Sequence, residues 1–238
     1  MTGASGGIGS ATARRLAEAG ARVALTYHSN EEAAEALREE LPGEGHLVVR
    51  LQVEHSESLT HLADTVRECF GTLDLLVNNA GMTRYVAHDD LDGLDDALID
   101  QIFRVNWRGA FACVRALKDL LMDGEGGLVV NVSSIAGTTG EGSNVAYCAS
   151  KAALDSMTRS LARALAPKLR VVSVAPGLVE GEYAQQLEPA WRQDQIERTP
   201  LHRLAEADDV ANAVLALATL LPFTTGDIIH VDGGRPLS

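Results

Sequence analysis

The alternation of short apolar runs with longer amphipathic stretches constrains the fold of this chain more than any other feature. Runs of strand length, rich in valine and leucine, occupy residues 22–26, 47–53, 73–77, 127–133 and 170–175. Continuous apolar runs are typical of parallel strands that are covered on both faces. Stretches with the apolar period of a helix occupy residues 8–19, 31–40, 58–70, 94–122, 146–166 and 208–220. This alternation predicts right-handed crossovers and a doubly wound α/β sheet.

The chain shows no linker, repeat or low-complexity tract, so we expect residues 1–238 to form a single domain. Asn30 and Ser56 stand where helix N-caps are expected. One irregular stretch, residues 178–205, is polar and contains Pro189 and Pro200. Long insertions near the carboxyl ends of strands are commonly functional. We therefore expect a substrate lid at about residues 178–205.

Charge and composition exclude several classes of function. The net charge is −13, which disfavours binding to nucleic acid and to anionic membranes. The apolar runs are shorter than the roughly 20 residues that span a bilayer, and no basic-then-apolar leader opens the chain. The 3 cysteines form no C-x-x-C pair and the 7 histidines no H-E-x-x-H motif, so we expect no metal site. The expected location is the cytoplasm.

A glycine-rich loop opens the sequence. Residues 2–9 read TGASGGIG and lead directly into an amphipathic stretch. Glycines let the backbone turn tightly and approach a pyrophosphate, while a helix N-terminus offers unpaired N–H groups and a positive dipole end. This pattern predicts dinucleotide binding by Gly3, Ser5, Gly7, Ile8 and Gly9.

The strand that normally leads into such a loop is missing, because only Met1 precedes Thr2. In a doubly wound sheet this first strand is central, and its loss leaves unpaired groups on both neighbours. We hypothesise that Met1 is an internal or mis-assigned start; the alternative is a genuine truncation that is unstable or inactive. Thermal unfolding of the chain with and without its upstream coding sequence distinguishes the two.

The choice between NADP(H) and NAD(H) depends on the turn after the second expected strand. An acidic residue about 20 positions past the glycines typically binds the adenosine ribose hydroxyls. Here the turn contains His28, Ser29 and Asn30, and the first carboxylate is Glu31. Since a carboxylate would repel the additional phosphate of NADP(H), its absence favours NADP(H), with these three residues as phosphate contacts. NAD(H) stays an alternative because the turn contains no arginine, and the turn can also be a plain helix cap.

Tyr147 and Lys151 lie four residues apart on an expected helix and therefore share a face. A free tyrosine has a pKa of about 10 and is a poor acid at neutral pH. A lysine ammonium and a cationic nicotinamide nearby stabilise the phenolate and lower that pKa. Tyr147 is therefore the candidate acid that protonates a substrate carbonyl. The alternative is a core tyrosine beside a solvated lysine.

Two further polar residues are candidates for the same site. Ser134 lies 13 residues before Tyr147, at the carboxyl end of an expected strand, where α/β sheets bind their ligands. It can orient the carbonyl oxygen, although Ser133 competes for this role. Asn106 interrupts an expected helix, where asparagine is unfavourable. We interpret it as a polar kink that holds a water between Lys151 and solvent; the alternative is a helix-surface residue.

Together these motifs resemble the short-chain dehydrogenase/reductase family over essentially the whole chain. The family pattern T-G-x-x-x-G-x-G corresponds to residues 2–9 and N-N-A-G to residues 78–81; the family's C-terminal strand resembles residues 225–234. The resemblance implies that Asn106, Ser134, Tyr147 and Lys151 are the catalytic tetrad. It implies a Rossmann-like fold with strand order 3-2-1-4-5-6-7, from which this chain lacks the first strand. It also implies a homotetramer or homodimer that contacts through the long helices ending near residues 122 and 166.

The resemblance implies further cofactor contacts. Besides Tyr147 and Lys151, they are Gln52, Val53, Asn79, Ala80, Gly81, Pro176, Gly177 and Val179. Gln52 stands where the family often has an aspartate, and its amide can still bind adenine. After Pro176-Gly177 the family commonly has a threonine, whereas this chain has Leu178-Val179. Recognition of the carboxamide is therefore expected to use backbone groups.

Among these enzymes the chain is similar to the 3-oxoacyl-[acyl-carrier-protein] reductases. This similarity implies NADPH-dependent reduction of a 3-oxoacyl thioester or a related small ketone. Acyl carrier protein is then a candidate partner, but carrier proteins are acidic and so is this chain; the basic residues that could compensate are Lys168, Arg170, Arg192, Arg198 and Arg203. Two alternatives stay open: NAD(P)-dependent oxidation of a secondary alcohol or polyol, and a non-catalytic NADP-binding regulatory protein. The complete tetrad argues against the latter.

Overall fold

The strands of the protein are all parallel, as the apolar runs predicted. The computed structural model describes residues 1–185 and 187–237, with the backbone alone at residues 182 and 183. The strands are β1 (Ala24–Tyr27), β2 (Leu47–Arg50), β3 (Leu75–Asn78), β4 (Gly127–Val132), β5 (Leu169–Pro176) and β6 (Ile228–Val231). Each hydrogen-bonded pair is parallel. Among the described helices, none is long and apolar enough to cross a lipid bilayer.

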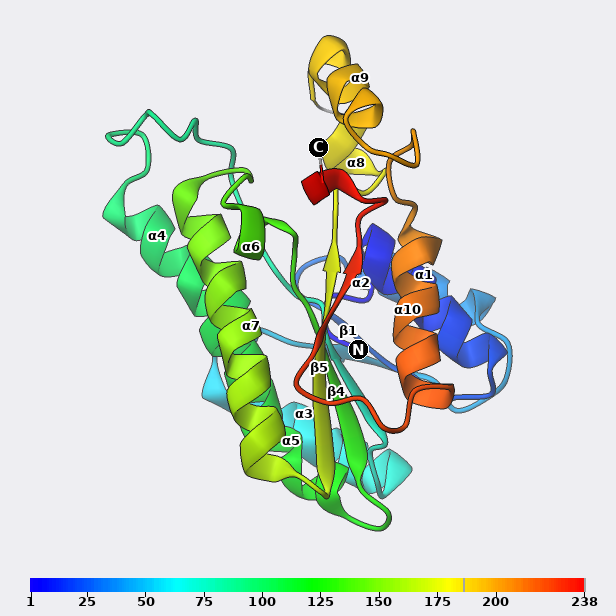
Figure 1. The fold of residues 1–238 in the computed structure, drawn as a ribbon. Helices are drawn as coiled ribbons and strands as arrows, with labels where there is room; N and C mark the ends of the chain where they lie inside the picture. Colours follow the sequence, from blue (N-terminus) through cyan, green and yellow to red (C-terminus); the bar gives the residue numbers. More distant parts are fainter. Residues whose placement is uncertain (186, 238) are drawn as a thin grey trace.

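Helices cover both faces of the sheet. They are α1 (Gly7–Glu18), α2 (Glu31–Glu40), α3 (Ser56–Phe70), α4 (Asp96–Phe103), α5 (Ala110–Met122), α6 (Ala136–Thr139), α7 (Val145–Leu165), α8 (Glu182–Gln185), α9 (Pro189–Glu197) and α10 (Ala207–Thr219). One apolar core lies between the sheet and helices α3, α5 and α7, and a second lies under α1, α2 and α10. Figure 1 shows α5 and α7 on one side of the strands and α1 and α10 on the other.

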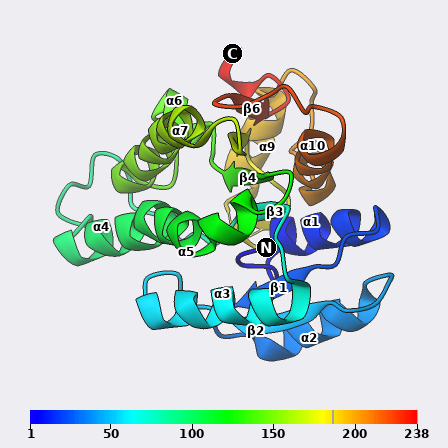
Figure 2. The same ribbon diagram turned by 90° about the horizontal axis from the view of Figure 1, so that it is seen from below.

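The sheet consists of two hydrogen-bonded parts, one with the order β1-β2 and the other with the order β3-β4-β5-β6. Figure 2 shows β1 and β2 beside α2 and α3, next to the larger part. Met1 and Thr2 lie between the two parts: Thr26 N donates to Met1 O at 3.1 Å, and Thr2 N donates to Val77 O at 2.9 Å. The two residues therefore occupy the place of the first strand in the order 3-2-1-4-5-6-7, and the remaining strands follow that order.

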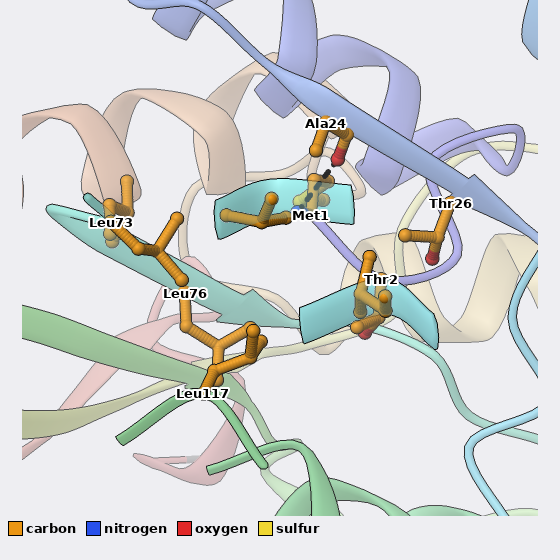
Figure 3. Close-up of a pocket in the computed structure, with 10 residues that line it drawn as sticks. Met1, Thr2, Ala24, Thr26, Leu73, Leu76 and Leu117 are labelled. Atoms are coloured by element: carbon orange, nitrogen blue, oxygen red, sulfur yellow. Dashed lines mark hydrogen bonds between the residues drawn. The ribbon is translucent and has the colours of Figure 1, made fainter. Parts of the chain in front are cut away.

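The junction between the two parts is incompletely filled. A cavity of about 20 Å³ lies beside Met1 and Thr2, and its wall includes Ala24, Leu76 and Leu117 (Figure 3). The Met1 ammonium group donates to Ala24 O at 3.0 Å, and burial lowers its pKa to about 6. A few backbone contacts thus replace a full strand between β1 and β3. The hypothesis about the start of the chain stays a prediction.

The predicted elements are confirmed, with corrections at three places. The helix expected at residues 94–122 is divided by a π-helix at Arg104–Gly109 into α4 and α5. The strand expected at residues 47–53 ends at Arg50, and beyond it Gln52 N donates to Ser58 Oγ. Ser56 is the first residue of α3 and not its N-cap. Asn30 does cap α2, since its side chain accepts from Ala33 N at 3.0 Å.

Candidate active site

Helix α7 positions Tyr147 and Lys151 at the carboxyl end of the sheet. Asn144 caps the helix, because its side chain accepts from Tyr147 N at 2.7 Å and donates to Arg84 O at 2.7 Å. These bonds fix the first turn of α7, from which the half-buried Tyr147 projects. Lys151 Nζ lies 5.6 Å from the centroid of the Tyr147 ring. The predicted pairing of the two side chains on one face is thus present.

Lys151 is buried, with an exposed fraction of 6%. Its Nζ donates to Val132 O at 2.8 Å, at the end of β4. Burial lowers the pKa of Lys151 to about 8, and the negative charge of Asp155 raises it in part. The alternative of a core tyrosine beside a solvated lysine is therefore wrong. A buried ammonium close to a phenol favours the phenolate more than a solvated one does, because the screening by water is weaker.

The two serines after β4 differ in accessibility. Ser133 is buried, and its Oγ donates to Lys151 O at 3.4 Å. Ser134 is partly exposed, and its Oγ accepts from Ala136 N at 3.2 Å. Since that bond uses the Ser134 oxygen as acceptor, the hydroxyl proton can still be donated to a substrate oxygen. The geometry favours Ser134 over Ser133 as the substrate-binding serine.

Asn106 lies in the π-helix between α4 and α5 and is 1% exposed. Its Oδ1 accepts from Met82 N at 2.8 Å, and its Nδ2 donates to Met82 O at 3.0 Å and to Ser150 Oγ at 3.1 Å. The interpretation as a polar kink agrees with the π-helix, and the alternative of a helix-surface residue is wrong. A Cβ atom on Gly81 would lie 3.4 Å from Asn106 Oδ1 and 3.8 Å from Lys151 Nζ, so both groups border Gly81.

The glycine-rich loop fits a pyrophosphate. Gly3 has a φ of +62°, and a Cβ atom on Gly9 would lie 2.2 Å from Gly3 O, so both positions require glycine. Apart from its chain neighbours and the backbone of its own helix, no heavy atom of the described chain lies within 4 Å of a Cβ atom placed on Gly7. Helix α1 begins at Gly7, and its N-cap Gly6 provides no side-chain hydrogen bond. The first turn of α1, with Ile8, therefore presents N–H groups to an anion beside an accessible glycine surface.

Thr2 connects the glycine-rich loop to the turn after β3. Its Oγ1 accepts from the N–H groups of Asn79 and Ala80, each at 2.9 Å. Asn79 Nδ2 in turn donates to Gly3 O at 2.9 Å. These bonds hold the two expected cofactor-binding segments together. Sequence reasoning assigned Thr2 no role, although the threonine that opens the family pattern was the available signal.

The turn expected to bind the ribose end of the cofactor is exposed, but one of its three side chains already caps a helix. His28, Ser29 and Asn30 are exposed, and the Asn30 side chain is used as the cap of α2. Burial raises the pKa of the Tyr27 hydroxyl, and a hydrogen bond with Glu31 raises it further. Glu31, the first carboxylate after the turn, thus lies close to the Tyr27 hydroxyl. Gln52 and Val53 follow β2, where Gln52 is half-buried and Val53 is buried.

The carboxyl end of β5 leads into the expected lid. Gly177 N donates to Val231 O at 3.0 Å, and Pro176 O accepts from Ile135 N at 3.0 Å. Val179 forms a parallel bridge with Ala205, so the two ends of the segment 178–205 are joined at its base. Figure 1 shows α8 and α9 beyond the carboxyl end of the sheet. Gln186 and the side chains of residues 182 and 183 lie outside the described part of this segment.

Arg235, which the sequence did not single out, connects the lid to the loop before α7. It is 8% exposed, and its guanidinium donates to Gln195 Oε1 on α9 at 3.3 Å. It also donates to Glu141 Oε2 at 3.4 Å. Because arginine is common on protein surfaces, the sequence alone gave no signal for this role.

The chain is similar to known proteins over nearly its whole length. The family model described as enoyl-(acyl carrier protein) reductase matches residues 3–235. A protein of the granaticin polyketide synthase of Streptomyces violaceoruber, named as a ketoacyl reductase, is 39% identical over 240 residues, which cover 100% of this chain and 95% of the relative. The 3-oxoacyl-[acyl-carrier-protein] reductase FabG of Staphylococcus aureus is 34% identical over 238 residues, which cover 98% of this chain and 96% of that protein.

The similarity extends to three dimensions. A crystal structure from Burkholderia xenovorans, assigned as a short-chain dehydrogenase/reductase, aligns with a TM-score of 0.94 at 34% identity. The alignment covers 100% of this chain and 97% of the other. The chain belongs to the short-chain dehydrogenase/reductase family and is an NAD(P)-dependent oxidoreductase that acts on carbonyl or CH–OH groups.

Proposed function

We propose that the protein uses NADPH to reduce the ketone of a 3-oxoacyl thioester, or of a related small molecule, to a secondary alcohol. The observation that carries this proposal is the buried Lys151 Nζ, 5.6 Å from the centroid of the Tyr147 ring. This pair lies at the same edge of the sheet as Ser134 and the turn after β5. The names of the relatives from Streptomyces and Staphylococcus support a 3-oxoacyl substrate.

The residues present fit a dinucleotide. Gly3, Gly7 and Gly9, with Ser5 and Ile8, would hold the pyrophosphate, and Asn79, Ala80 and Gly81 would border the adenosine half with Gln52 and Val53. Pro176, Gly177 and Val179 would border the nicotinamide. NADPH supplies the hydride for the carbonyl carbon when it is bound. NADP(H) is favoured because His28, Ser29 and Asn30 present no carboxylate.

The side chains provide the acid chemistry of the reaction. Ser134 donates a hydrogen bond to the ketone oxygen, and Tyr147 transfers its phenolic proton to that oxygen as the carbonyl carbon is reduced. The Lys151 ammonium stabilises the resulting phenolate, which then takes a proton from solvent. Asn106 holds the Met82 backbone and helix α7 in place, so the distance between Lys151 and Tyr147 is maintained. A water bound near Asn106 stays a prediction, and so does a homotetramer or homodimer.

The charges around the site favour a small thioester over docking of an acidic carrier protein. Lys168 and Arg170 lie at the amino end of β5, where they donate to Gly124 O and to carbonyl groups at the end of α10. They are therefore at the opposite end of the sheet from Tyr147. The other basic residues considered are already paired with carboxylates: Arg192 with Glu180, Arg198 with Asp194 and Arg203 with Asp209.

The Tyr147→Phe variant tests the chemistry. Loss of the phenolic proton should lower kcat by roughly 10²–10⁴-fold with an acetoacetyl thioester, while the NADPH dissociation constant stays nearly unchanged. Tyr85→Phe is the matched control, because Tyr85 is 66% exposed and the proposed mechanism assigns it no role. Unchanged ketone reduction by Tyr147→Phe would contradict the mechanism.

A substrate panel tests the specificity. Acetoacetyl-coenzyme A, acetoacetyl carrier protein, free ketones and polyols are compared with NADPH, NADH and their oxidised forms. We expect the highest kcat/KM with NADPH and the small thioester. Turnover of secondary alcohols or polyols with NAD alone would establish the oxidative alternative. Tight NADPH binding without any turnover would favour the regulatory protein.

A further inference from the structure

Asp155 is a buried carboxyl group that the mechanism above does not use. It lies on α7, four residues after Lys151, and it is 3% exposed. Neither of its carboxyl oxygens accepts a hydrogen bond of good distance and angle from the described groups. Buried polar groups in proteins are nearly always paired, and a buried charge is costly without an opposite charge nearby. The position of Asp155 therefore requires an explanation.

The surroundings of Asp155 contain two cations and two hydroxyl groups. The cations are Lys151 and Arg159, both on α7. The other packed elements present uncharged groups: Ser133 after β4, Ser173 on β5 and Gly137 on α6. A Cβ atom on Gly137 would lie 3.2 Å from Asp155 Oδ2 and 2.9 Å from Ala152 N, so α6 packs tightly over the carboxyl group. Burial raises the pKa of Asp155, whereas the two hydroxyls, Arg159 and Lys151 lower it.

The same interaction acts on Lys151. Burial lowers the pKa of the ammonium, and the charge of Asp155 is the opposing influence that raises it. Tyr147, Lys151 and Asp155 follow one another at intervals of four residues and therefore lie along one side of α7. Lys151 thus lies between the phenol on one side and the carboxyl group on the other.

We propose that Asp155 is a positioning residue of the active site: its buried carboxylate, one helical turn beyond Lys151, is the counter-charge that keeps this lysine an ammonium beside Tyr147. The inference rests on the proposed function only for its effect on turnover. Without the carboxylate, the buried lysine loses its proton closer to neutral pH. Tyr147 then loses the positive charge that stabilises its phenolate.

The protonation of Lys151 can be measured directly, because Lys118, Lys151 and Lys168 are the 3 lysines of the chain. Protein labelled with ¹³C at the lysine ε-carbon gives few NMR signals, which Lys118→Arg and Lys168→Arg assign. In Asp155→Asn we expect the Lys151 titration midpoint to move to lower pH, by on the order of one pH unit. The signals of Lys118 and Lys168 should not move. An unchanged Lys151 midpoint in the folded variant would overturn the proposal.

Two further variants keep the test decisive. Asp155→Ser carries a smaller polar side chain and should give the same direction of shift if Asp155→Asn does not fold. Asp119→Asn is the matched control, since Asp119 pairs with the exposed Lys118, and solvent screening should leave the Lys118 midpoint nearly unchanged. A Lys118 shift as large as that of Lys151 would show that burial of the pair is not the cause and would contradict the proposal.

The pH profile separates an electrostatic role from a structural one. The kcat/KM of Asp155→Asn should be on the order of tenfold below that of the wild type at pH 8, with a much smaller loss at pH 6, where the lysine is protonated in both proteins. An equal loss at all pH values would indicate a structural role and overturn the proposal. The NMR titration needs no turnover, so a shifted midpoint without ketone reduction would refute the proposed function and support the role of Asp155.

Discussion

The polar wall of the site and its lid are held in place in opposite ways. We define the polar wall as Asn106, Ser133, Lys151 and Asp155, all of which are at least nine-tenths buried. In the lid, helix α9 buries none of its side chains, and it is held by partly exposed ion pairs such as Arg192 with Glu180. The wall therefore fixes the groups that are proposed to carry out the chemistry. Helix α9, in contrast, is held in part by ion pairs that solvent screens, beside the buried Arg235 side chain that donates to Gln195 Oε1.

The difference indicates how the two regions respond to substitution. Removing one partner of a buried hydrogen bond leaves the other without a partner, which costs about 1–3 kcal/mol. Removing one partner of an exposed ion pair costs about 0–1 kcal/mol. Changes in the wall should therefore alter stability and turnover together. Changes in the lid should alter substrate affinity while the fold stays intact.

The largest expected effect is the pH dependence that Lys151 gives to stability. Its pKa is lowered from 10.5 to about 8 in the folded protein. Between these pH values the unfolded state binds more protons, so the contribution of Lys151 to the free energy of unfolding increases as pH rises. The increase should approach about 3 kcal/mol across the window. Urea unfolding of the wild type and of Lys151→Met, from pH 7 to 10, measures it as the difference between the two curves.

The Lys151→Met reference removes the contributions of titrating groups that do not interact with Lys151, which the two proteins share. The difference should flatten towards pH 7, where the lysine is largely protonated in both states. Parallel curves up to pH 10 would show that Lys151 is solvated. Lys151 would then not be a buried residue of the polar wall, and the contrast between the wall and the lid would be wrong.

The second prediction concerns the hydrogen bonds of Asn106. Asn106→Ala removes bonds to both backbone groups of Met82 and to Ser150 Oγ. Because these partners are buried or partly buried, the free energy of unfolding should fall by about 2–3 kcal/mol. Urea denaturation measures the loss. Gln193→Ala on α9 is the lid control: its side chain bonds to Glu197 Oε1 at 3.0 Å on the exposed surface, so a change below about 0.5 kcal/mol is expected. Equal losses in the two variants would contradict the contrast.

Some features of these two regions could be predicted from the sequence and others could not. The difference lies in whether the interacting residues are close together or far apart along the chain. Tyr147 and Lys151 could be paired from their spacing, since both lie on one helix, and the glycine-rich loop could be recognised because Gly3 and Gly9 are required by backbone geometry. Residue patterns predicted the parallel sheet for the same reason: each strand is a continuous apolar run. These features depend on local order along the chain.

The remaining features depend on contacts between distant segments. The sequence could not predict that Lys151 is buried against Val132 O, or that Asn106 forms hydrogen bonds with the backbone of Met82. The helical period of a sequence does not show what packs against a polar residue. The hydrogen bonds from Arg235 to Gln195 and Glu141 join segments that are far apart in the sequence. Asp155 was missed for a related reason: a single aspartate on a helix is usually solvated.

The smallest effect is expected for Arg192→Ala, in the lid. The ion pair with Glu180 joins α9 to the base of the lid, beside the bridge between Val179 and Ala205. Its loss should change the free energy of unfolding by less than about 0.5–1 kcal/mol. The KM for the acyl substrate should rise by about two- to fivefold, because a looser lid must be ordered when substrate binds. Steady-state kinetics with urea unfolding measures both quantities, and kcat and NADPH affinity should stay unchanged.

Arg67→Ala is the matched control for that variant, since Arg67 forms a 2.9 Å pair with Asp64 on α3, away from the lid. It should leave both KM and stability nearly unchanged. A loss of more than about 2 kcal/mol in Arg192→Ala would mean that the lid pair behaves like a buried network. In that case the lid would be part of the core, and substrate specificity could not change without a loss of stability. An increase in KM with no loss of stability would instead show that the lid adjusts to substrate independently of the wall that holds Tyr147 and Lys151.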